Sequence, residues 1–165
     1  MVFFLSEQRL KADLLHENVG GEYIRPSMIT AHTIYLKELI GDSLYNTLEK
    51  AVENQDVRDQ YKELLDNYII PYLEFTVMAE LTMNVAFKFR NLGIVNTSDV
   101  NAAQVGIEQT KYFQNYYHSK SEYYANRVKR FLTLNREKFP EYTECGGCDQ
   151  VTAPKNSTYG GLWLN

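Results

Sequence analysis

The clearest chemical pattern in the sequence is a pair of cysteines, Cys145 and Cys148, separated by two glycines. Such a pair can supply two of the four ligands of a structural zinc ion, or can form a redox disulfide where it opens a helix beside a strand. No histidine lies near the pair in the sequence to complete a zinc site, and no strand pattern is evident. Zinc binding and redox chemistry stay open as alternatives, but an ordinary flexible turn needs no further ligands. We expect no metal and no cofactor.

Other patterns that would support catalysis do not occur in the sequence. Asp13 and His16 stand three residues apart on an expected helix, but a single pair of this kind is usually a surface contact. The chain has no His-Glu-x-x-His motif, no paired Glu-x-x-His set, no phosphate-binding glycine loop and no serine elbow. We therefore expect no catalytic residues and no enzymatic activity.

The segment from Tyr112 to Leu132 is unusually aromatic, with aromatic residues at 7 of its 21 positions. They come mostly in adjacent pairs, which makes both flanks of a helix aromatic: Tyr112, Phe113, Tyr116, Tyr117, Tyr123, Tyr124 and Phe131. Basic residues gather toward the C-terminal end of the segment, where a helix dipole favours cations: Arg127, Lys129, Arg130, Arg136 and Lys138.

Three interpretations of this segment are open. It can be one core stripe beside a solvated basic face, a contact surface for another subunit, or a site for single-stranded nucleic acid. The net charge of −4 argues against the third. One face of a helix cannot bury all seven rings in a small bundle, so we expect a partner interface that includes the following residues: Tyr112, Tyr116, Tyr117, Tyr123, Tyr124, Arg127 and Arg130.

Both ends of the chain carry apolar residues where a free monomer is normally polar. Phe3 and Phe4 precede Ser6, a candidate helix cap, so they fit either a hydrophobic staple or a partner contact. The last ten residues combine small polar residues and glycines with a few large apolar ones that we expect to contact a partner: Tyr159, Leu162, Trp163 and Leu164.

Length and charge limit the remaining possibilities. A chain of 165 residues fits one domain, and no apolar run approaches the ~18 residues of a transmembrane helix. The N-terminus lacks the basic leader of a signal peptide. Residues 1–100 carry 9 basic and 15 acidic residues, a net charge of −6, whereas residues 101–165 carry 8 and 6, a net charge of +2.

The elements expected to position these residues are helical almost throughout. After a short helix capped by Ser6, apolar spacing predicts a helix over about 27–40, opened by Pro26 and stopped by Gly41, and a third helix capped by Asp42 or Ser43. A segment from about residue 56 meets Pro71 and restarts as the most apolar helix, which is expected to run to Gly93 and to lie centrally.

A last helix is expected from about 99 to 138, with Gly106 and the polar residues 119–121 as places where it could divide. The result is an all-α helical bundle with one long C-terminal helix and extended N- and C-terminal arms. We expect a helical domain over 1–140 and an extended arm over 141–165.

The order of these features resembles a known family. A short capped helix and a glycine loop are followed by ITAHTIYLKELIGDSLYNTLE, then YKELLDNYIIPYLEFTVMAEL, then a long helix ending in FLTLNREKFPEY. The pattern is similar to the head-to-tail connector proteins of tailed bacteriophages, most of all those of crAss-like phages of Bacteroides. Its landmarks are Gly41, Pro71, Asn135, Phe139 and Pro140.

The resemblance implies a virion structural protein of the phage neck, assembled in the host cytoplasm. Such proteins form a ring, usually of about twelve copies, between the portal and the tail. The implied partners are further copies of the chain, the portal protein and other neck or tail proteins; DNA passes through the channel without sequence-specific binding, and no membrane is involved. The alternative is a helical scaffold or regulatory protein that binds a phage or host partner through the aromatic helix.

Overall fold

The computed structural model describes residues 2–15, 19–90, 93–96 and 107–142. The fold is all-α, as expected, with one short β-hairpin. Two π-helices, η1 and η2, interrupt the α-helical elements. In chain order the elements are α1 (Glu7–Asp13), α2 (Gly21–Thr30), η1 (Ala31–Leu36), α3 (Lys37–Ile40), α4 (Asp42–Glu53), α5 (Asp59–Leu64), η2 (Leu65–Ile69), α6 (Ile70–Ala86), β1 (Phe87–Arg90), β2 (Gly93–Asn96) and α7 (Ile107–Leu134).

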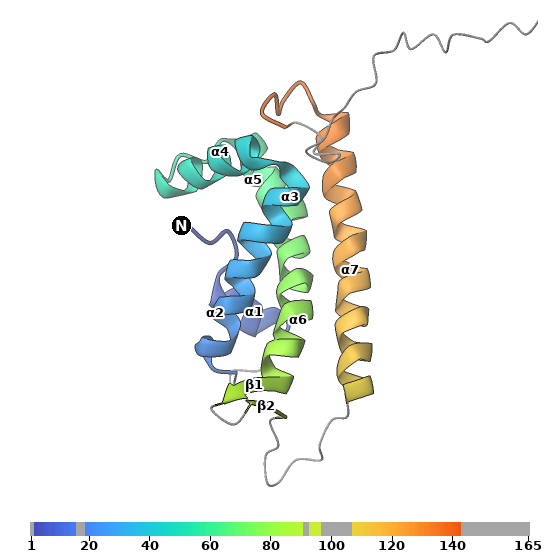
Figure 1. Ribbon diagram of the computed structural model, residues 1–165. Coiled ribbons are helices and arrows are strands. Elements are labelled where there is room, and N and C mark those ends of the chain that lie inside the picture. The colour runs from blue at the N-terminus through green and yellow to red at the C-terminus, as the bar shows by residue number, and fades with distance from the viewer. Residues whose placement is uncertain (1, 16–18, 91–92, 97–106, 143–165) are drawn as a thin grey trace, which may run out of the picture.

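Helix α6 lies at the centre of the bundle, as its apolar sequence predicts. It packs along α7 on one side and along α2 and η1 on the other (Figure 1). The continuous segment α2–η1–α3 ends at one end of the bundle, where α4 crosses it and points away from α7 (Figure 1). The largest buried side chains come from the segment between Leu5 and α6, with Phe139 added from beyond α7.

Thr76, Glu80 and Asn84 form a narrow polar stripe along α6 and make hydrogen bonds to the neighbouring helices. The hydroxyl of Thr76 lies 2.7 Å from that of Ser121 on α7. Glu80 accepts a hydrogen bond from the Tyr35 hydroxyl at 2.8 Å, and the Asn84 amide donates to the Ser27 hydroxyl at 2.8 Å. Because a buried polar group costs free energy unless it is paired, these contacts fix the rotation of α6 between its neighbours.

Prolines lie close to both π-helices, and neither ends a helix. Pro71 is the second residue of α6, directly after η2. It has no N–H to donate to the carbonyl of Asn67, and its ring crowds that carbonyl, which a locally widened turn can accommodate. In place of the expected kink or restart at Pro71, the structure has a π-turn directly before α6.

The second helix begins earlier than the sequence suggested. It starts at Gly21, so Pro26 lies inside α2 instead of opening a helix at Ser27. The carbonyl that Pro26 cannot satisfy belongs to Glu22, in the first turn, where the side chain is exposed and water can take the missing bond.

Gly41 makes the sharp turn between α3 and α4. Its φ of 80° and ψ of 153° belong to a region that only glycine adopts readily. The residue ends α3 and occupies the N-cap position of α4, so neither Asp42 nor Ser43 is the cap that the sequence suggested.

The most apolar helix ends at Ala86 instead of continuing to Gly93. The chain continues as an antiparallel hairpin in which Phe87 pairs with Asn96 and Arg90 with Gly93. The alternation Phe-Lys-Phe-Arg and the β-branched pair Ile94-Val95 favour strands, and these local preferences prevail where the bundle ends.

Helix α7 is continuous across residues 119–121 and ends at Leu134, four residues before the expected end at 138, and the expected start over 99–106 lies outside the described residues. The described helix covers 28 residues. That length corresponds to about 42 Å. Asn135 follows its last residue and donates a side-chain hydrogen bond to the Phe131 carbonyl at 2.9 Å. The chain then turns so that Phe139 and Tyr142 become buried. The packed body therefore includes Tyr142, two residues beyond the expected boundary at 140.

Candidate partner interface on helix α7

One side of α7 is fixed by aromatic stacking on the bundle. Tyr124 stacks on Phe75 of α6, with ring centroids 5.3 Å apart and 13° between the planes. Phe131 stacks on Tyr68 of η2, with centroids 4.1 Å apart. Val128 lies between these two stacks in sequence and is fully buried. Together these contacts set the rotation of α7 about its own axis.

The opposite side of α7 presents large apolar residues to solvent. We call this side the outer face of α7. Its exposed side chains range from 45% accessible for Tyr116 to 74% for Leu134, and the set comprises Tyr112, Tyr116, Tyr123 and Leu134. Two open grooves of about 480 and 450 Å³ follow the helix and meet at Tyr123, which lines both.

Cations lie against the aromatic rings of α7. The Lys120 ammonium lies 4.3 Å from the ring centroid of Tyr116 and 5.1 Å from that of Phe75. The Arg127 guanidinium lies 5.5 Å from the ring centroids of both Tyr68 and Tyr124. Such cation–π contacts hold the long side chains along the helix while their charge stays near the surface.

The structure divides the expected interface residues on α7 into two sets. Tyr112, Tyr116 and Tyr123 are exposed on the outer face, and Arg127 and Arg130 line the second groove beside Tyr123. Tyr117 and Tyr124 instead are half-buried against the core. The prediction that both flanks of the helix are aromatic is confirmed, and only one flank is free of the bundle.

Leu134 belongs to the outer face but was not predicted as an interface residue. The signal for Leu134 is present in the sequence, because Tyr112, Tyr123 and Leu134 follow one another at intervals of eleven residues. Eleven residues make three turns of an α-helix, so the three side chains share one face. Phe113 is exposed as well, but it lies eighteen residues, or five turns, before Phe131 and therefore on the side of α7 that faces the bundle.

Phe3 and Phe4 pack on the chain's own body. The Phe3 ring meets the His32 ring edge-on with centroids 5.2 Å apart, and Phe4 contacts both His32 and Tyr45. The Phe4 amide donates a hydrogen bond to His32 Nε2 at 3.1 Å. These two residues are therefore occupied within the fold, and we do not include them in the candidate interface.

The expected contact residues of the C-terminal arm lie outside the described residues. These are Tyr159, Leu162, Trp163 and Leu164, and the same holds for Cys145 and Cys148.

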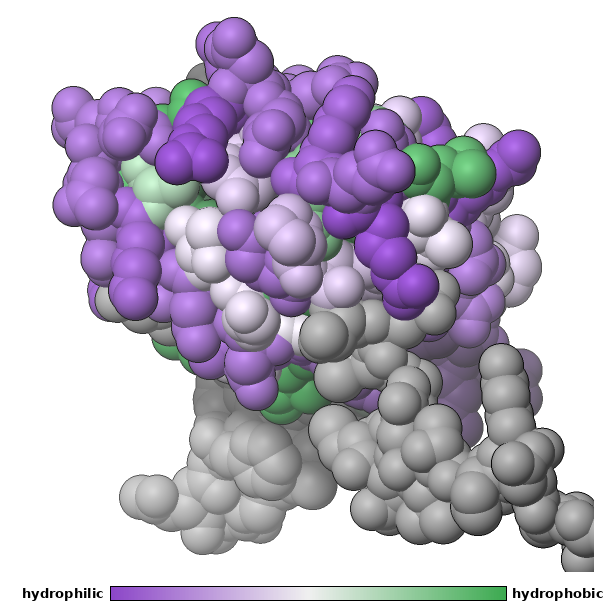
Figure 2. Space-filling view, turned by 90° about the horizontal axis from the view of Figure 1, so that it is seen from above, coloured by the Kyte–Doolittle hydropathy of each residue, from purple (hydrophilic) through white to green (hydrophobic). Residues whose placement is uncertain are grey.

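The exposed apolar residues are concentrated along the sides of the bundle. Viewed from the end near α3 and α4, the described surface is mostly hydrophilic, with only small separate hydrophobic patches (Figure 2). Among the described residues, no helix is both long and apolar enough to cross a membrane.

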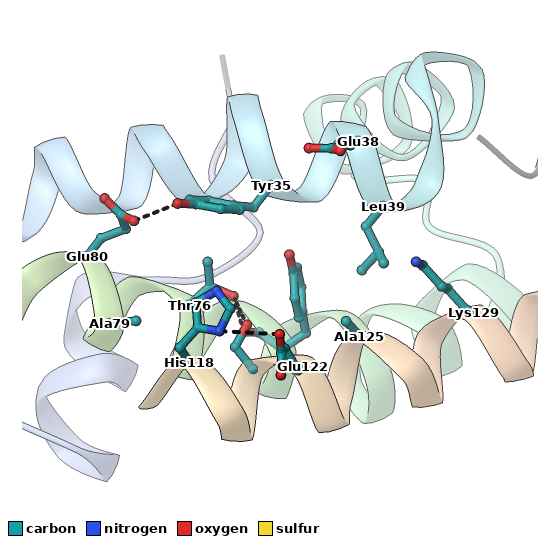
Figure 3. Close-up of a pocket in the computed structure, with 12 residues that line it drawn as sticks. Tyr35, Glu38, Leu39, Thr76, Ala79, Glu80, His118, Glu122, Ala125 and Lys129 are labelled. Atoms are coloured by element: carbon teal, nitrogen blue, oxygen red, sulfur yellow. Dashed lines mark hydrogen bonds and ion pairs between the residues drawn. The ribbon is translucent and has the colours of Figure 1, made fainter. Parts of the chain in front are cut away.

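A hollow of about 350 Å³, separate from the two grooves, lies between η1–α3, α6 and α7 (Figure 3). Polar and charged side chains converge on it: Tyr35, Glu38, Tyr72, Glu80, His118, Glu122 and Lys129. Tyr35 is already hydrogen-bonded to Glu80, and His118 Nδ1 lies 3.5 Å from Glu122 (Figure 3).

The tyrosines of this hollow are held in their protonated form. Burial raises the pKa of Tyr72 to about 12. The hydrogen bond to Glu80, together with burial, raises the pKa of Tyr35. Both phenols therefore keep their protons at neutral pH and are not nucleophiles, and Tyr35 donates its proton in the hydrogen bond to Glu80. Within the described part of the chain, no three His, Cys, Asp or Glu side chains are grouped so that they could hold a metal ion.

Comparisons with known proteins complete the description. No curated protein and no solved structure matches the chain. The sequence model of a family of unknown function, DUF6712, matches residues 36–152, which include α3 to α7 and therefore the whole outer face of α7. Because this match covers well over half of the 165 residues, the chain belongs to the DUF6712 family.

Proposed function

We propose that this protein is a structural subunit that acts by assembling, and that it forms the ring between the portal and the tail of a tailed bacteriophage. In that role it extends the DNA channel and gives tail components a surface to attach to. The observation that carries the proposal is the outer face of α7, where Tyr112, Tyr116 and Tyr123 are exposed on a helix that the bundle holds rigidly.

Exposed tyrosines on a rigid helix suit an assembly surface. Tyrosine and phenylalanine bury a large area when they are covered, and the tyrosine hydroxyl keeps the uncovered face compatible with water. Isolated apolar residues on a surface need no explanation, but a contiguous row along one helix usually marks a contact. The grooves on either side of Tyr123 offer concave sites for the side chains of a partner.

The resemblance to phage connectors supports the finer part of the proposal, and its landmarks have physical roles in this fold. Gly41 makes the turn between α3 and α4, and Pro71 follows a π-turn. Asn135 caps the end of α7, and Phe139 is fully buried. The landmarks therefore specify a particular bundle and not helicity in general.

The charge distribution fits a DNA channel in one respect. A channel that passes DNA should repel phosphates and not bind them tightly. Residues 1–100 have a net charge of −6, whereas α7 carries five basic and two acidic residues. The basic outer face of α7 is thus better placed between subunits than on the channel wall.

The C-terminal arm has a separate part in the proposal. We expect Trp163 and Leu164 to fill pockets on the portal or on the next neck component. Removing residues 156–165 should leave the unfolding transition unchanged and weaken attachment of the ring to its partner. Unchanged attachment in a pull-down with the portal would remove the arm from the mechanism.

The decisive experiment is quantitative mass spectrometry of density-purified virions. Copy number is measured against the major capsid protein, with the portal protein as an internal reference for one ring per particle. About twelve copies per particle, or another count equal to a closed ring, is the expected result. Absence of the protein from particles would end the connector proposal and favour the scaffold or regulatory role.

A further inference from the structure

Residues 2–5 precede α1 and lie against η1 and α4 (Figure 1). We call this segment the N-terminal strap. Leu5 is fully buried, and the rings of Phe3 and Phe4 pack on His32, with Phe4 also against Tyr45. Among the described residues, no backbone–backbone hydrogen bond joins the strap to the rest of the chain. Contacts with side chains therefore hold it in place.

Two hydrogen bonds to titratable side chains fix the backbone of the strap. The Phe4 amide donates to His32 Nε2 at 3.1 Å, and the Val2 amide donates to Glu49 Oε1 at 3.2 Å. The other ring nitrogen of His32, Nδ1, lies 2.8 Å from the Met28 carbonyl and carries the proton of the neutral ring. Nε2 can accept the Phe4 amide only while it carries no proton of its own.

A proton on Nε2 would turn this contact from attraction into repulsion. The ring would become positively charged, and its new N–H would meet the N–H of Phe4. Burial lowers the pKa of His32, and the hydrogen bond to the Met28 carbonyl acts in the opposite direction. A buried imidazolium is costly unless it is paired, and moving the strap aside gives the charged ring access to water.

Among the described residues, no charged side chain is a cause of the pKa shift of His32, so none acts as its counter-ion. Glu49 accepts from Val2 of the strap. The other charged groups on the surrounding helices have contacts of their own: Lys37 with the Tyr45 ring, Arg9 with Glu74, and Glu80 with Tyr35. Opening of the strap is therefore the available response to a charge on His32.

The strap also lies beside a hydroxyl group that it does not satisfy. Tyr45 is 1% exposed, and its hydroxyl has no hydrogen-bond partner among the described residues. Burial raises the pKa of Tyr45, and so does the charge of Glu49, the same carboxylate that accepts from Val2. A buried hydroxyl without a partner costs free energy that water would relieve. The closed strap is thus less stable than its apolar contacts alone would make it.

We infer that the N-terminal strap is a pH-dependent latch, closed on η1 and α4 while His32 is neutral and released as one segment when Nε2 is protonated. The helical bundle stays folded on release. The open form exposes the rings of Phe3 and Phe4, so acidification controls whether these two side chains are available for contact. The latch is independent of the connector role, which depends on α7.

Amide hydrogen exchange of the full chain, followed by NMR between about pH 7.5 and 5.5, measures the opening. Each exchange rate, divided by the intrinsic rate at that pH, gives an opening constant. With the ordinary pKa of 6.5 for His32 in the open form, the opening constant of the Phe4 amide should rise about tenfold over this range. The amide of Leu48, a buried residue of α4, reports opening of the bundle. Phe4 should open more often than Leu48 at every pH.

Three variants assign the effect to its parts. His32→Gln keeps an oxygen that can accept from Phe4 but cannot become charged, so its opening constant should not change with pH. Glu49→Gln is the matched control, since it removes the other titratable acceptor of the strap and should keep the rise. Tyr45→Phe removes the unsatisfied hydroxyl and should lower the Phe4 opening constant at every pH, with the rise retained.

Several outcomes would contradict the latch. Equal opening constants for Phe4 and Leu48 would show that the strap moves only when the whole bundle unfolds. A rise that survives in His32→Gln, or that disappears in Glu49→Gln, would place the pH dependence outside the imidazole. A Phe4 opening constant that Tyr45→Phe does not lower would show that the strap does not cover this hydroxyl. None of these results bears on the presence of the protein in virions, so the latch and the connector role fail separately.

Discussion

The ring of Tyr124 lies nearly parallel to that of Phe75, with 13° between the planes and 5.3 Å between the centroids. This contact joins α7 to the central helix α6. Successive residues of an α-helix point about 100° apart, so with Tyr124 turned inward its neighbour Tyr123 is turned toward solvent. Two adjacent tyrosines therefore have different surroundings: Tyr124 packs on the core, and Tyr123 is exposed to solvent.

This pair gives the first prediction. Tyr124→Ala should lower the free energy of unfolding by roughly 1–3 kcal/mol, because it removes a stacked, half-buried ring. Tyr123→Ala should change it by less than about 0.5 kcal/mol. Urea denaturation of both variants measures the difference, and equal losses would show that α7 is rotated differently.

The second prediction concerns the end of the packed body. A chain that stops after residue 142 keeps Phe139 and Tyr142, the buried residues that the structure describes beyond α7. A chain that stops after residue 138 loses Phe139, which contacts Tyr61 and Phe131, and loses Tyr142 as well. We expect it to be less stable by at least about 3–5 kcal/mol, the usual cost of deleting a buried phenylalanine ring. Thermal unfolding compares the two chains, and equal midpoints would place Phe139 outside the core.

The helical architecture could be predicted from the sequence, because apolar spacing and the glycines that end helices determine local structure. The central position of α6 and the stop at Gly41 were both predicted and are confirmed. The two π-helices were not, since a π-turn widens the helix locally while the apolar pattern around it still reads as helical. The hairpin was missed for a related reason: Phe87 and Phe89 fit an apolar helix and an alternating strand equally well.

The candidate interface could be predicted only in part. Adjacent aromatic pairs such as Tyr116-Tyr117 and Tyr123-Tyr124 give α7 two equally apolar flanks. Which flank packs inward depends on residues far away in the sequence, chiefly Phe75, and no local pattern contains that information.

The third prediction concerns the buried hydroxyl pair between α6 and α7. Thr76 donates to the Tyr72 carbonyl at 2.8 Å, so Ser121 is the donor in its 2.7 Å bond to Thr76. Ser121→Ala should cost about 0.5–1.5 kcal/mol, whereas Thr76→Val should cost about 1–3 kcal/mol because it leaves the Ser121 hydroxyl buried without an acceptor. The double variant should cost less than the sum of the two. Additive losses in a double-mutant cycle would show that the two hydroxyls are not coupled.

The fourth prediction concerns Gly41. Its backbone conformation strains any residue with a Cβ, so Gly41→Ala should lower the free energy of unfolding by about 1–3 kcal/mol. Gly21→Ala is the matched control, since a Cβ there meets only the end of the flexible Glu7 side chain, with 3.0 Å to Oε1. That change should be close to neutral in denaturant unfolding. If both alanines cost the same, the turn does not depend on glycine.

The fifth prediction is a pH dependence that originates at His32. Its Nδ1 lies 2.8 Å from the Met28 carbonyl, and its Nε2 accepts the Phe4 amide, so the ring is satisfied in its neutral form, with the proton on Nδ1. Burial lowers its pKa below the ordinary value of 6.5. The unfolded chain therefore takes up a proton more readily than the folded one below pH 6.5. This contribution to stability is complete above that pH and is lost progressively as the pH falls below it.

Protonation of Nε2 would also remove the acceptor of the Phe4 amide and loosen the N-terminal segment. Denaturant unfolding at a series of pH values from about 7.5 to 5 measures the slope. His32→Gln should flatten that slope, whatever its effect on stability at neutral pH. A slope that persists unchanged in His32→Gln would show that the pH dependence does not originate at the buried ring.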